Sequence, residues 1–154
     1  MKLIIAAALT LMTTLAHADL KSDVAQIEAT NKACSDKAIS NNDMKQCAFS
    51  AQDAYDKLLN VTYKKIVAAL KAAIPQEKKD GPTVGGKTYS EETLNRLVVS
   101  ERAWVTFRDA QCSLESTEML GGTGEGLIIG GCLGDQTKDR ILSLDSILGS
   151  GVQQ

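Results

Sequence analysis

The chain has 154 residues with 17 basic and 19 acidic side chains, so its formal net charge is −2. This near balance, with the two signs interspersed, gives no reason to expect nucleic acid or an anionic membrane as a partner. The length fits one domain with a sizeable core, and the low aromatic content and only two prolines favour helices.

The N-terminal segment has the pattern of an export signal. Lys2 precedes an apolar run over 3–15, and Ala16-His17-Ala18 has the small-x-small pattern of a signal-peptidase site. The run is too short for a comfortable transmembrane helix. We therefore expect residues 1–18 to be a removable signal peptide and residues 19–154 to form a single helical domain in the periplasm or outside the cell. The expected new N-terminus has no lipid-accepting cysteine, so the sequence predicts no membrane anchor.

Two helices are predicted in the first half of the mature chain. Residues 22–38 have modest helical periodicity, and Asn41 or Asn42 is the expected cap of the next helix. From Met44 the apolar and small residues recur every three or four positions as far as Leu70. This stripe predicts a long helix that ends near Ile74-Pro75.

The second half of the chain predicts a loop, a helix, a glycine-rich excursion and a last helix. The loop covers 75–89, and Ser90 is the expected cap of a third helix that reaches Cys112. After the glycine-rich stretch, a last helix is expected to begin at Asp135 or Thr137, with apolar residues on adjoining faces: Ile141, Leu144, Ile147 and Leu148. The predicted fold is all-α, a small bundle of about four helices in which two long helices pack antiparallel.

Four cysteines in an exported chain predict two disulfides. Cys34 and Cys47 lie equally far from the Ser40-Asn41 step, so a helical hairpin that turns there would bring them face to face. Cys112 and Cys132 flank the glycine-rich stretch. We therefore expect the pairs Cys34–Cys47 and Cys112–Cys132, each worth about 3 kcal/mol in the chain-entropy model. Neither pair has CxxC spacing, which argues against a zinc site or a redox pair.

The stretch GGTGEGLIIGGCLG (121–134) has the glycine content of a phosphate-binding loop but not its chemistry. Gly121 and Gly126 have the P-loop spacing, yet Leu127 and Ile128 stand where lysine and a hydroxyl would meet the phosphates. We therefore expect no nucleotide and no other cofactor. The stretch predicts a turn-rich excursion in which Leu127, Ile128 and Ile129 either anchor it on the core or form an exposed apolar tip for a partner.

The sequence also argues against catalysis. Loss of residues 1–18 would remove His17, the only histidine, so a Ser-His-Asp or Cys-His site cannot form. Two carboxylates can suffice for glycoside hydrolysis, but the pairs Asp53/Asp56 and Glu115/Glu118 are more typical of a solvated helix face. We expect neither a catalytic site nor a bound metal.

Polar residues interrupt the predicted inward stripe of the third helix. Glu101 and Arg108 lie where the helix should face its neighbours, which predicts a half-buried network of ion pairs and hydrogen bonds. The alternative is that Arg108 contacts a partner, because arginine is enriched at interface hot spots. Trp104, Asn60 and Tyr63 are expected to pack between helices.

Three segments carry a family resemblance: CAFSAQDAYDKLLNVTY (47–63), ERAWVTFRDAQC (101–112) and a Gly-Gly, cysteine and T-x-x-R pattern within 121–144. Together they resemble the LprI-type lysozyme inhibitor family over about residues 34–146. The matched positions are Leu59, Asn60, Tyr63, Arg102, Ala103, Trp104, Phe107, Arg108, Asp109, Ala110, Cys112, Gly121, Gly122, Cys132, Thr137 and Arg140.

The resemblance implies an exported helical domain with structural disulfides whose partner is lysozyme or another cell-wall hydrolase. Such a protein would inhibit its target by occluding the substrate cleft. The alternative is an envelope interaction or immunity protein that neutralises a delivered toxin. The expected contact surfaces are the glycine-rich stretch and the segment 76–88, because function tends to lie on loops held by a rigid scaffold.

Overall fold

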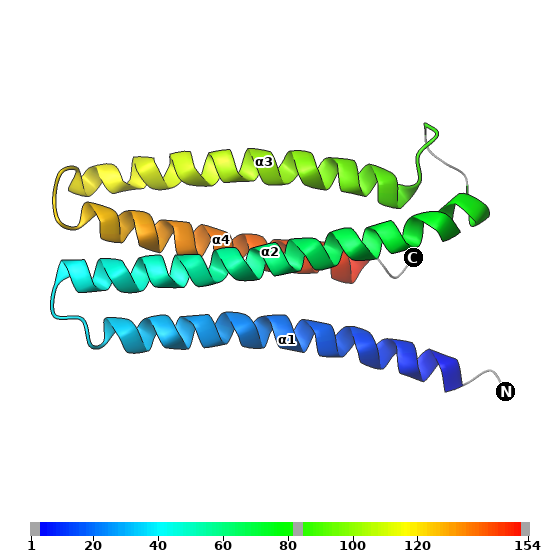
Figure 1. The fold of residues 1–154 in the computed structure, drawn as a ribbon, viewed down its shortest axis with the longest axis horizontal. Coiled ribbons are helices and arrows are strands. Elements are labelled where there is room, and N and C mark those ends of the chain that lie inside the picture. Colours follow the sequence, from blue (N-terminus) through cyan, green and yellow to red (C-terminus); the bar gives the residue numbers. More distant parts are fainter. Residues whose placement is uncertain (1–3, 82–84, 152–154) are drawn as a thin grey trace.

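The computed structural model describes the backbone of residues 4–81 and 85–151 and the side-chain surroundings of residues 20–81 and 85–146. Its elements are α1 (Ile4–Ser35), α2 (Asn41–Asp80), α3 (Tyr89–Glu115), the 3₁₀-helix η1 (Ser116–Met119) and α4 (Glu125–Gly151). The predicted all-α fold of four helices is confirmed (Figure 1).

The predicted signal peptide falls largely outside what the structure describes. Residues 1–3 are not described, and for residues 4–19 only the helical backbone is, so the signal peptide stays a prediction. The side chains of Ile147 and Leu148 also lie outside the described residues. Within the described part of the chain, none of the helices has the length and apolar character needed to cross a membrane.

Two helix caps differ by one or two residues from those predicted. Ser40, rather than Asn41 or Asn42, caps α2, because its Oγ accepts the backbone N–H of Asp43. Thr88, rather than Ser90, caps α3 in a capping box with Glu91. Ser90 lies in the first turn of α3, where both its N–H and its hydroxyl donate to Glu77 of α2.

The predicted end of the second helix at Ile74-Pro75 is wrong, since α2 continues through Pro75 to Asp80. A proline inside a helix removes one backbone hydrogen bond. Contacts beyond it compensate: the Gln76 amide donates to Asp80, and the Glu77 carboxylate is held by Ser90 of α3. The predicted loop over 75–89 is therefore reduced to 81–88, of which 82–84 are not described.

The predicted glycine-rich excursion is also wrong. The last helix begins at Glu125 rather than at Asp135 or Thr137, so most of the stretch is helical. Gly126, Gly130 and Gly134 lie four residues apart on the face of α4 that meets α2. A Cβ on Gly126 would come within 2.7 Å of the Lys45 side chain, and one on Gly130 within 3.2 Å of Ala48 Cβ. These glycines allow the two helices to approach closely, and this packing outweighs the low helix propensity of glycine.

The pair α2 and α4 forms the centre of the molecule. In Figure 1, α1 and α3 lie on opposite sides of this pair, and among the described residues they do not contact each other. The two long helices α2 and α3 run antiparallel, as predicted. The core has two parts, one between α1, α2 and α4 and one between α2, α3 and α4. Ile141 and Leu144 of α4 are fully buried, one in each part.

Both predicted disulfides are confirmed. Cys34–Cys47 joins α1 to α2, and Cys112–Cys132 joins α3 to α4. Both lie near the end of the bundle where the turns 36–40 and 116–124 meet, and we call this the stapled end. The opposite end, where residues 77–90 connect α2 to α3, is called the open end.

Candidate functional site

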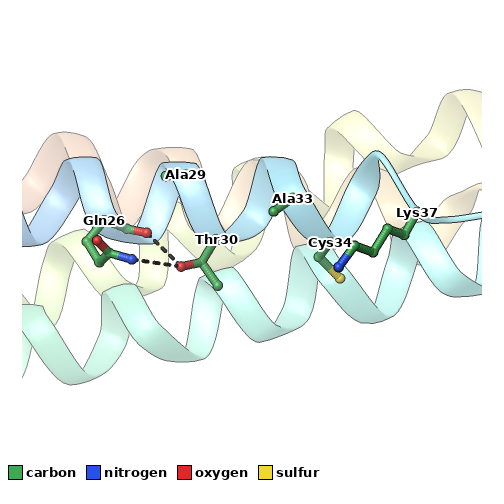
Figure 2. Close-up of a pocket in the computed structure, with 6 residues that line it drawn as sticks. All are labelled: Gln26, Ala29, Thr30, Ala33, Cys34 and Lys37. Atoms are coloured by element: carbon green, nitrogen blue, oxygen red, sulfur yellow. Dashed lines mark hydrogen bonds between the residues drawn. The ribbon is translucent and has the colours of Figure 1, made fainter.

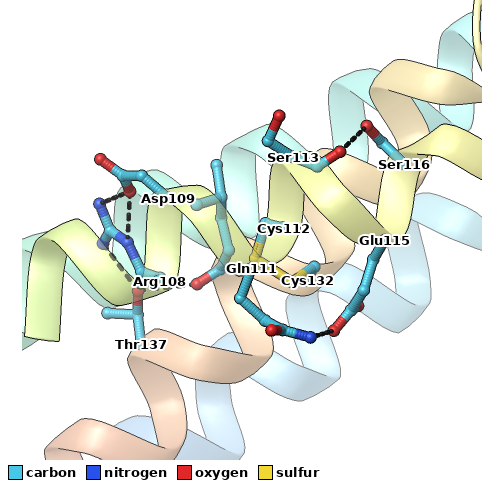
Figure 3. The surroundings of a disulfide bond; sticks show 10 residues. Arg108, Asp109, Gln111, Cys112, Ser113, Glu115, Ser116, Cys132 and Thr137 are labelled. Atoms are coloured by element: carbon cyan, nitrogen blue, oxygen red, sulfur yellow. Dashed lines mark hydrogen bonds and ion pairs between the residues drawn. A yellow bond between two sulfur atoms is a disulfide. The ribbon is translucent and has the colours of Figure 1, made fainter.

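A polar cluster lies where α2, α3 and α4 meet. The Arg108 side chain, only 12% exposed, places Nη1 3.0 Å from Asp56 Oδ1 and 3.1 Å from Thr137 Oγ1. Thr137 is fully buried and donates its own hydroxyl to the Leu133 carbonyl, 2.7 Å away. Arg108 also contacts the neighbouring Asp109 carboxylate. Figure 3 shows Arg108, which lies on the same helix as Cys112 of the Cys112–Cys132 bridge, with Thr137 and Asp109.

A second arginine joins the cluster through the tryptophan. Arg140 Nε donates to Glu101 Oε1 at 2.9 Å, and its Nη2 donates to Ser100 Oγ at 2.7 Å. The guanidinium carbons of Arg108 and Arg140 lie 5.1 and 5.8 Å from the centre of the Trp104 ring. Such cation–π contacts add to the ion pairs. The arginine–tryptophan cluster thus comprises Asp56, Glu101, Trp104, Arg108, Thr137 and Arg140.

This cluster is suited to holding helices together. Each arginine is matched by a carboxylate on another helix, Arg108 by Asp56 and Arg140 by Glu101. In both pairs the arginine is largely shielded from water, because its side chain is only 12% exposed in Arg108 and 15% exposed in Arg140. Arg108 could contact a partner only if it released Asp56 and Thr137. The geometry therefore favours the prediction that Arg108 belongs to an internal network of ion pairs and hydrogen bonds.

The other motif residues lie in different surroundings. Tyr63 and Leu59 are half-buried against the core. Asn60 is exposed rather than packed between helices, and its amide donates to the Asp56 carbonyl of its own helix. Arg102, Phe107, Gly121 and Gly122 are exposed. The motif therefore combines inward residues that join helices with residues that are exposed on the surface.

The stapled end exposes large apolar side chains from both of its turns. Ile39 is 96% exposed and Leu120 74% exposed, and Met44 and Met119 are partly exposed. We call these four residues the apolar end surface. Leu120 is followed by Gly121, whose φ of 74° lies in the left-handed region. Met44 was predicted to begin the inward stripe of the long helix, and Ile39, Met119 and Leu120 were missed, although apolar side chains inside a turn were a usable signal.

The turns that carry this surface are fixed to each other. Asn41 Nδ2, at the start of α2, donates to Thr123 Oγ1 at 3.1 Å. The Gly121 N–H donates to the Glu125 carboxylate at 2.9 Å, which ties the turn to the start of α4. With a disulfide behind each turn, the apolar end surface is rigid.

The three apolar residues that we expected either to anchor the glycine-rich stretch on the core or to form an exposed tip lie away from this surface. Leu127, Ile128 and Ile129 are half-buried in the first two turns of α4, not on a loop. Of the segment 76–88, residues 76–80 belong to α2. The apolar end surface is therefore the more exposed candidate for partner contact.

The open end has a different chemistry. Glu77 Oε1 accepts the Ser90 hydroxyl at 2.6 Å and Oε2 accepts the Ser90 N–H at 3.0 Å, and these hydrogen bonds lower the pKa of Glu77. Lys78 lies 2.7 Å from Glu91 and, together with the Thr88 N–H, lowers the pKa of Glu91. Capping and ion pairing, not covalent bonds, hold this end.

No feature of the described residues suggests a ligand-binding centre. The groove beside Cys34 is lined by one face of α1, and within it the Thr30 hydroxyl is hydrogen-bonded to Gln26 (Figure 2). Within the described part of the chain, no three His, Cys, Asp or Glu side chains lie together as metal ligands would.

The fold and its surfaces define a class of small helical domain with two disulfides, an internal arginine–tryptophan cluster and an apolar end. The family model described as "Lysozyme inhibitor LprI" matches residues 34–144, so this chain belongs to the LprI family. An uncharacterized protein of Rhizobium meliloti (strain 1021) is 34% identical over 114 residues, which cover 74% of this chain and 78% of that protein. No solved structure matches the chain significantly.

Proposed function

We propose that this protein is exported and inhibits a lysozyme or related peptidoglycan hydrolase by covering its substrate cleft with the apolar end surface. The observation that carries the proposal is the match of residues 34–144 to the lysozyme inhibitor family. The export pattern of residues 1–18 supports it, because peptidoglycan lies outside the cytoplasm. In this proposal the protein acts by binding and not by catalysis, and the pairing of Arg108 with Asp56 and of Arg140 with Glu101 inside the bundle supports that.

The stapled end suits this task because an enzyme cleft is concave and its blocker must be convex and rigid. Ordering a flexible loop on binding costs free energy, whereas a surface that is already fixed avoids that cost. The Asn41–Thr123 hydrogen bond and the two disulfides fix this end before contact. Leu120, 74% exposed in its turn, would enter the cleft as the central anchor, because burial of a leucine side chain contributes about 1.5–3 kcal/mol.

Charge gives weaker support to the same proposal. The net charge of −2 is opposite in sign to the basic surface of many lysozymes, and opposite charges speed association. Glu118 and Glu125 lie in or beside the turn that carries Leu120, so part of this negative charge is near the proposed contact.

The test is a turbidity assay of cell-wall lysis by lysozyme with purified, oxidised protein. We expect the native chain to slow lysis and Leu120→Asp to weaken that inhibition at least tenfold. Tyr89→Asp is the matched control, because Tyr89 is 62% exposed at the open end, and it should inhibit like the native chain. Far-ultraviolet circular dichroism of each variant checks the fold.

Two results would overturn the proposal at different levels. Undiminished lysis at a large molar excess of the native chain would reject inhibition of that lysozyme. Capture of a delivered toxin from the envelope by the same chain would then support the immunity alternative. Equal inhibition by the native chain and Leu120→Asp would keep the function and reject the apolar end surface.

A further inference from the structure

Helix α3 carries polar and charged side chains on its inward face beside the buried Leu97, and it carries a row of apolar side chains on its outward face. Its inward face carries Ser90, Glu101 and Arg108, all of which pair with α2 or α4. Its outward face carries an apolar stripe of five residues: Val99, Ala103, Phe107, Ala110 and Leu114. They are spaced by three or four positions, so they lie on one side of the helix. All five are exposed, the three larger ones by 68% (Val99), 55% (Phe107) and 64% (Leu114).

No described part of the chain covers this stripe. α3 packs on α2 and α4, and α1, which could have closed the bundle, lies on the far side of that pair (Figure 1). The polar group of Thr106, at the edge of the stripe, is already satisfied, because its hydroxyl donates to the Arg102 carbonyl at 3.1 Å. An unpartnered apolar face of this length is typical of an interaction surface.

We infer that the apolar stripe binds the same stripe of a second copy, with the two α3 helices antiparallel about a two-fold axis. A two-fold interface must be self-complementary, with residue i facing j and j facing i. The stripe meets this condition, because its sizes alternate large, small, large, small, large. An axis at Thr106-Phe107 would set Val99 against Leu114 of the second copy and Ala103 against its Ala110. The alanines leave room for the two Phe107 rings.

Charges beyond the two ends of the stripe support the antiparallel direction. Arg96, whose side chain is 80% exposed and contacts Glu92 of the same helix at 2.9 Å, lies one turn before Val99. Glu118, also exposed, lies four residues after Leu114 in η1, just beyond the end of α3. The same axis sets Arg96 of each copy opposite residue 117 of the other, next to Glu118, so two pairs of opposite charges come near each other. A parallel pair would instead set like charges against each other, which opposes association.

The stripe also sets the strength of the expected dimer. Residues 99–114 span roughly 22 Å of helix. A single pair of helices of that length buries on the order of 1,000 Å² in total, near the lower limit for specific association. The dimer should therefore form and dissociate with concentration.

The experiment is sedimentation velocity of the oxidised full chain over a wide range of concentrations. We expect the average mass to rise from that of a monomer towards that of a dimer. Phe107→Glu should weaken association at least tenfold, because it places two charges at the axis. Val61→Glu is the matched control: Val61 is an exposed apolar residue of α2, 47% exposed, and its change should leave association as in the native chain.

A charge swap tests the direction of the pair. Arg96→Glu alone should weaken the dimer several-fold, and adding Glu118→Arg should restore it. A native chain that stays monomeric at every concentration, or a Phe107→Glu variant that associates like the native chain, would overturn the inference. A monomeric chain whose lysozyme inhibition is lost in Phe107→Glu would also overturn it and assign the stripe to the hydrolase. The lysis and sedimentation measurements are separate, so either proposal can fail alone.

Discussion

The two ends of the bundle are held by different chemistry. At the stapled end, Cys34–Cys47 and Cys112–Cys132 fix the helices beside both turns, and apolar side chains are exposed. At the open end, Glu77 and Glu91 hold the start of α3 through hydrogen bonds and an ion pair. The stapled end can expose apolar side chains and keep its helices in place, because the disulfides, and not the burial of those side chains, hold the helices together. We expect the stability of the open end to depend on pH and salt, since its contacts depend on charge.

The largest expected effect comes from removing a disulfide at the stapled end. Cys112→Ala with Cys132→Ala should lower the free energy of unfolding by about 3 kcal/mol in the chain-entropy model. Cys34→Ala with Cys47→Ala should cost slightly less, because the sequence separation is 13 residues instead of 20. Guanidinium denaturation of the oxidised variants measures both. Unchanged midpoints in both variants would show that the stapled end does not rely on its disulfides.

The next effect concerns the close approach of α2 and α4 near this end. A Cβ on Gly130 would lie 3.2 Å from Ala48 Cβ and 3.3 Å from the Phe49 backbone N, and a backbone cannot yield easily. Gly130→Ala should therefore destabilise by roughly 1–2 kcal/mol through overpacking. The adjacent Gly131 has nothing within 4 Å, so Gly131→Ala should stabilise by about 0.5–1 kcal/mol through helix propensity. Thermal unfolding of the pair checks the opposite signs, and equal shifts would reject the packing explanation.

These glycines also show where sequence reasoning succeeds and where it fails. The disulfides were predictable, because the positions of Cys34 and Cys47 about a turn imply a hairpin. The start of α4 was not, because local propensity argues against glycine in a helix and only the packing on α2 reverses that preference. The spacing of Gly126, Gly130 and Gly134 by four residues was the one local signal. It suggests a helix face only once a closely packed neighbour is considered.

The arginine–tryptophan cluster and the apolar stripe were also predictable only in part. The inward position of Arg108 and Glu101 followed from helical periodicity, but their partners Asp56 and Arg140 depend on how three helices align. The apolar stripe of α3 was missed for the opposite reason. Periodicity shows that Val99, Phe107 and Leu114 share a face, yet it cannot tell whether the fold buries that face. α1 packs on the other side of α2 and α4, and this arrangement leaves the stripe exposed.

A smaller effect is expected from a single change at the open end. Ser90→Ala removes the hydroxyl that donates to Glu77 at 2.6 Å and leaves the backbone N–H contact in place. The loss should be about 1 kcal/mol, the usual net value of one hydrogen bond. Hydrogen exchange should show faster opening of residues near the start of α3 and no change beside Cys112–Cys132. Uniformly faster exchange along the chain would show that the two ends are not independent.

The smallest effect is a difference in the response of the two ends to acid. Hydrogen bonds from Ser90 lower the pKa of Glu77 below its ordinary value of 4.5, and contacts with Lys78 and Thr88 lower that of Glu91. A carboxyl group whose pKa is lower in the folded state stabilises the fold above its unfolded pKa, and that contribution is lost as pH falls through the folded value. Hydrogen exchange at the open end should therefore gain an excess opening below about pH 4.5 once the intrinsic exchange rate is corrected. The stapled end should show a smaller excess, because its two disulfides hold the helices together at every pH. In Glu77→Gln the excess opening at low pH should shrink, since the amide keeps an oxygen that accepts from Ser90 but has no charge to lose. An unchanged acid response in that variant would show that another group causes the sensitivity.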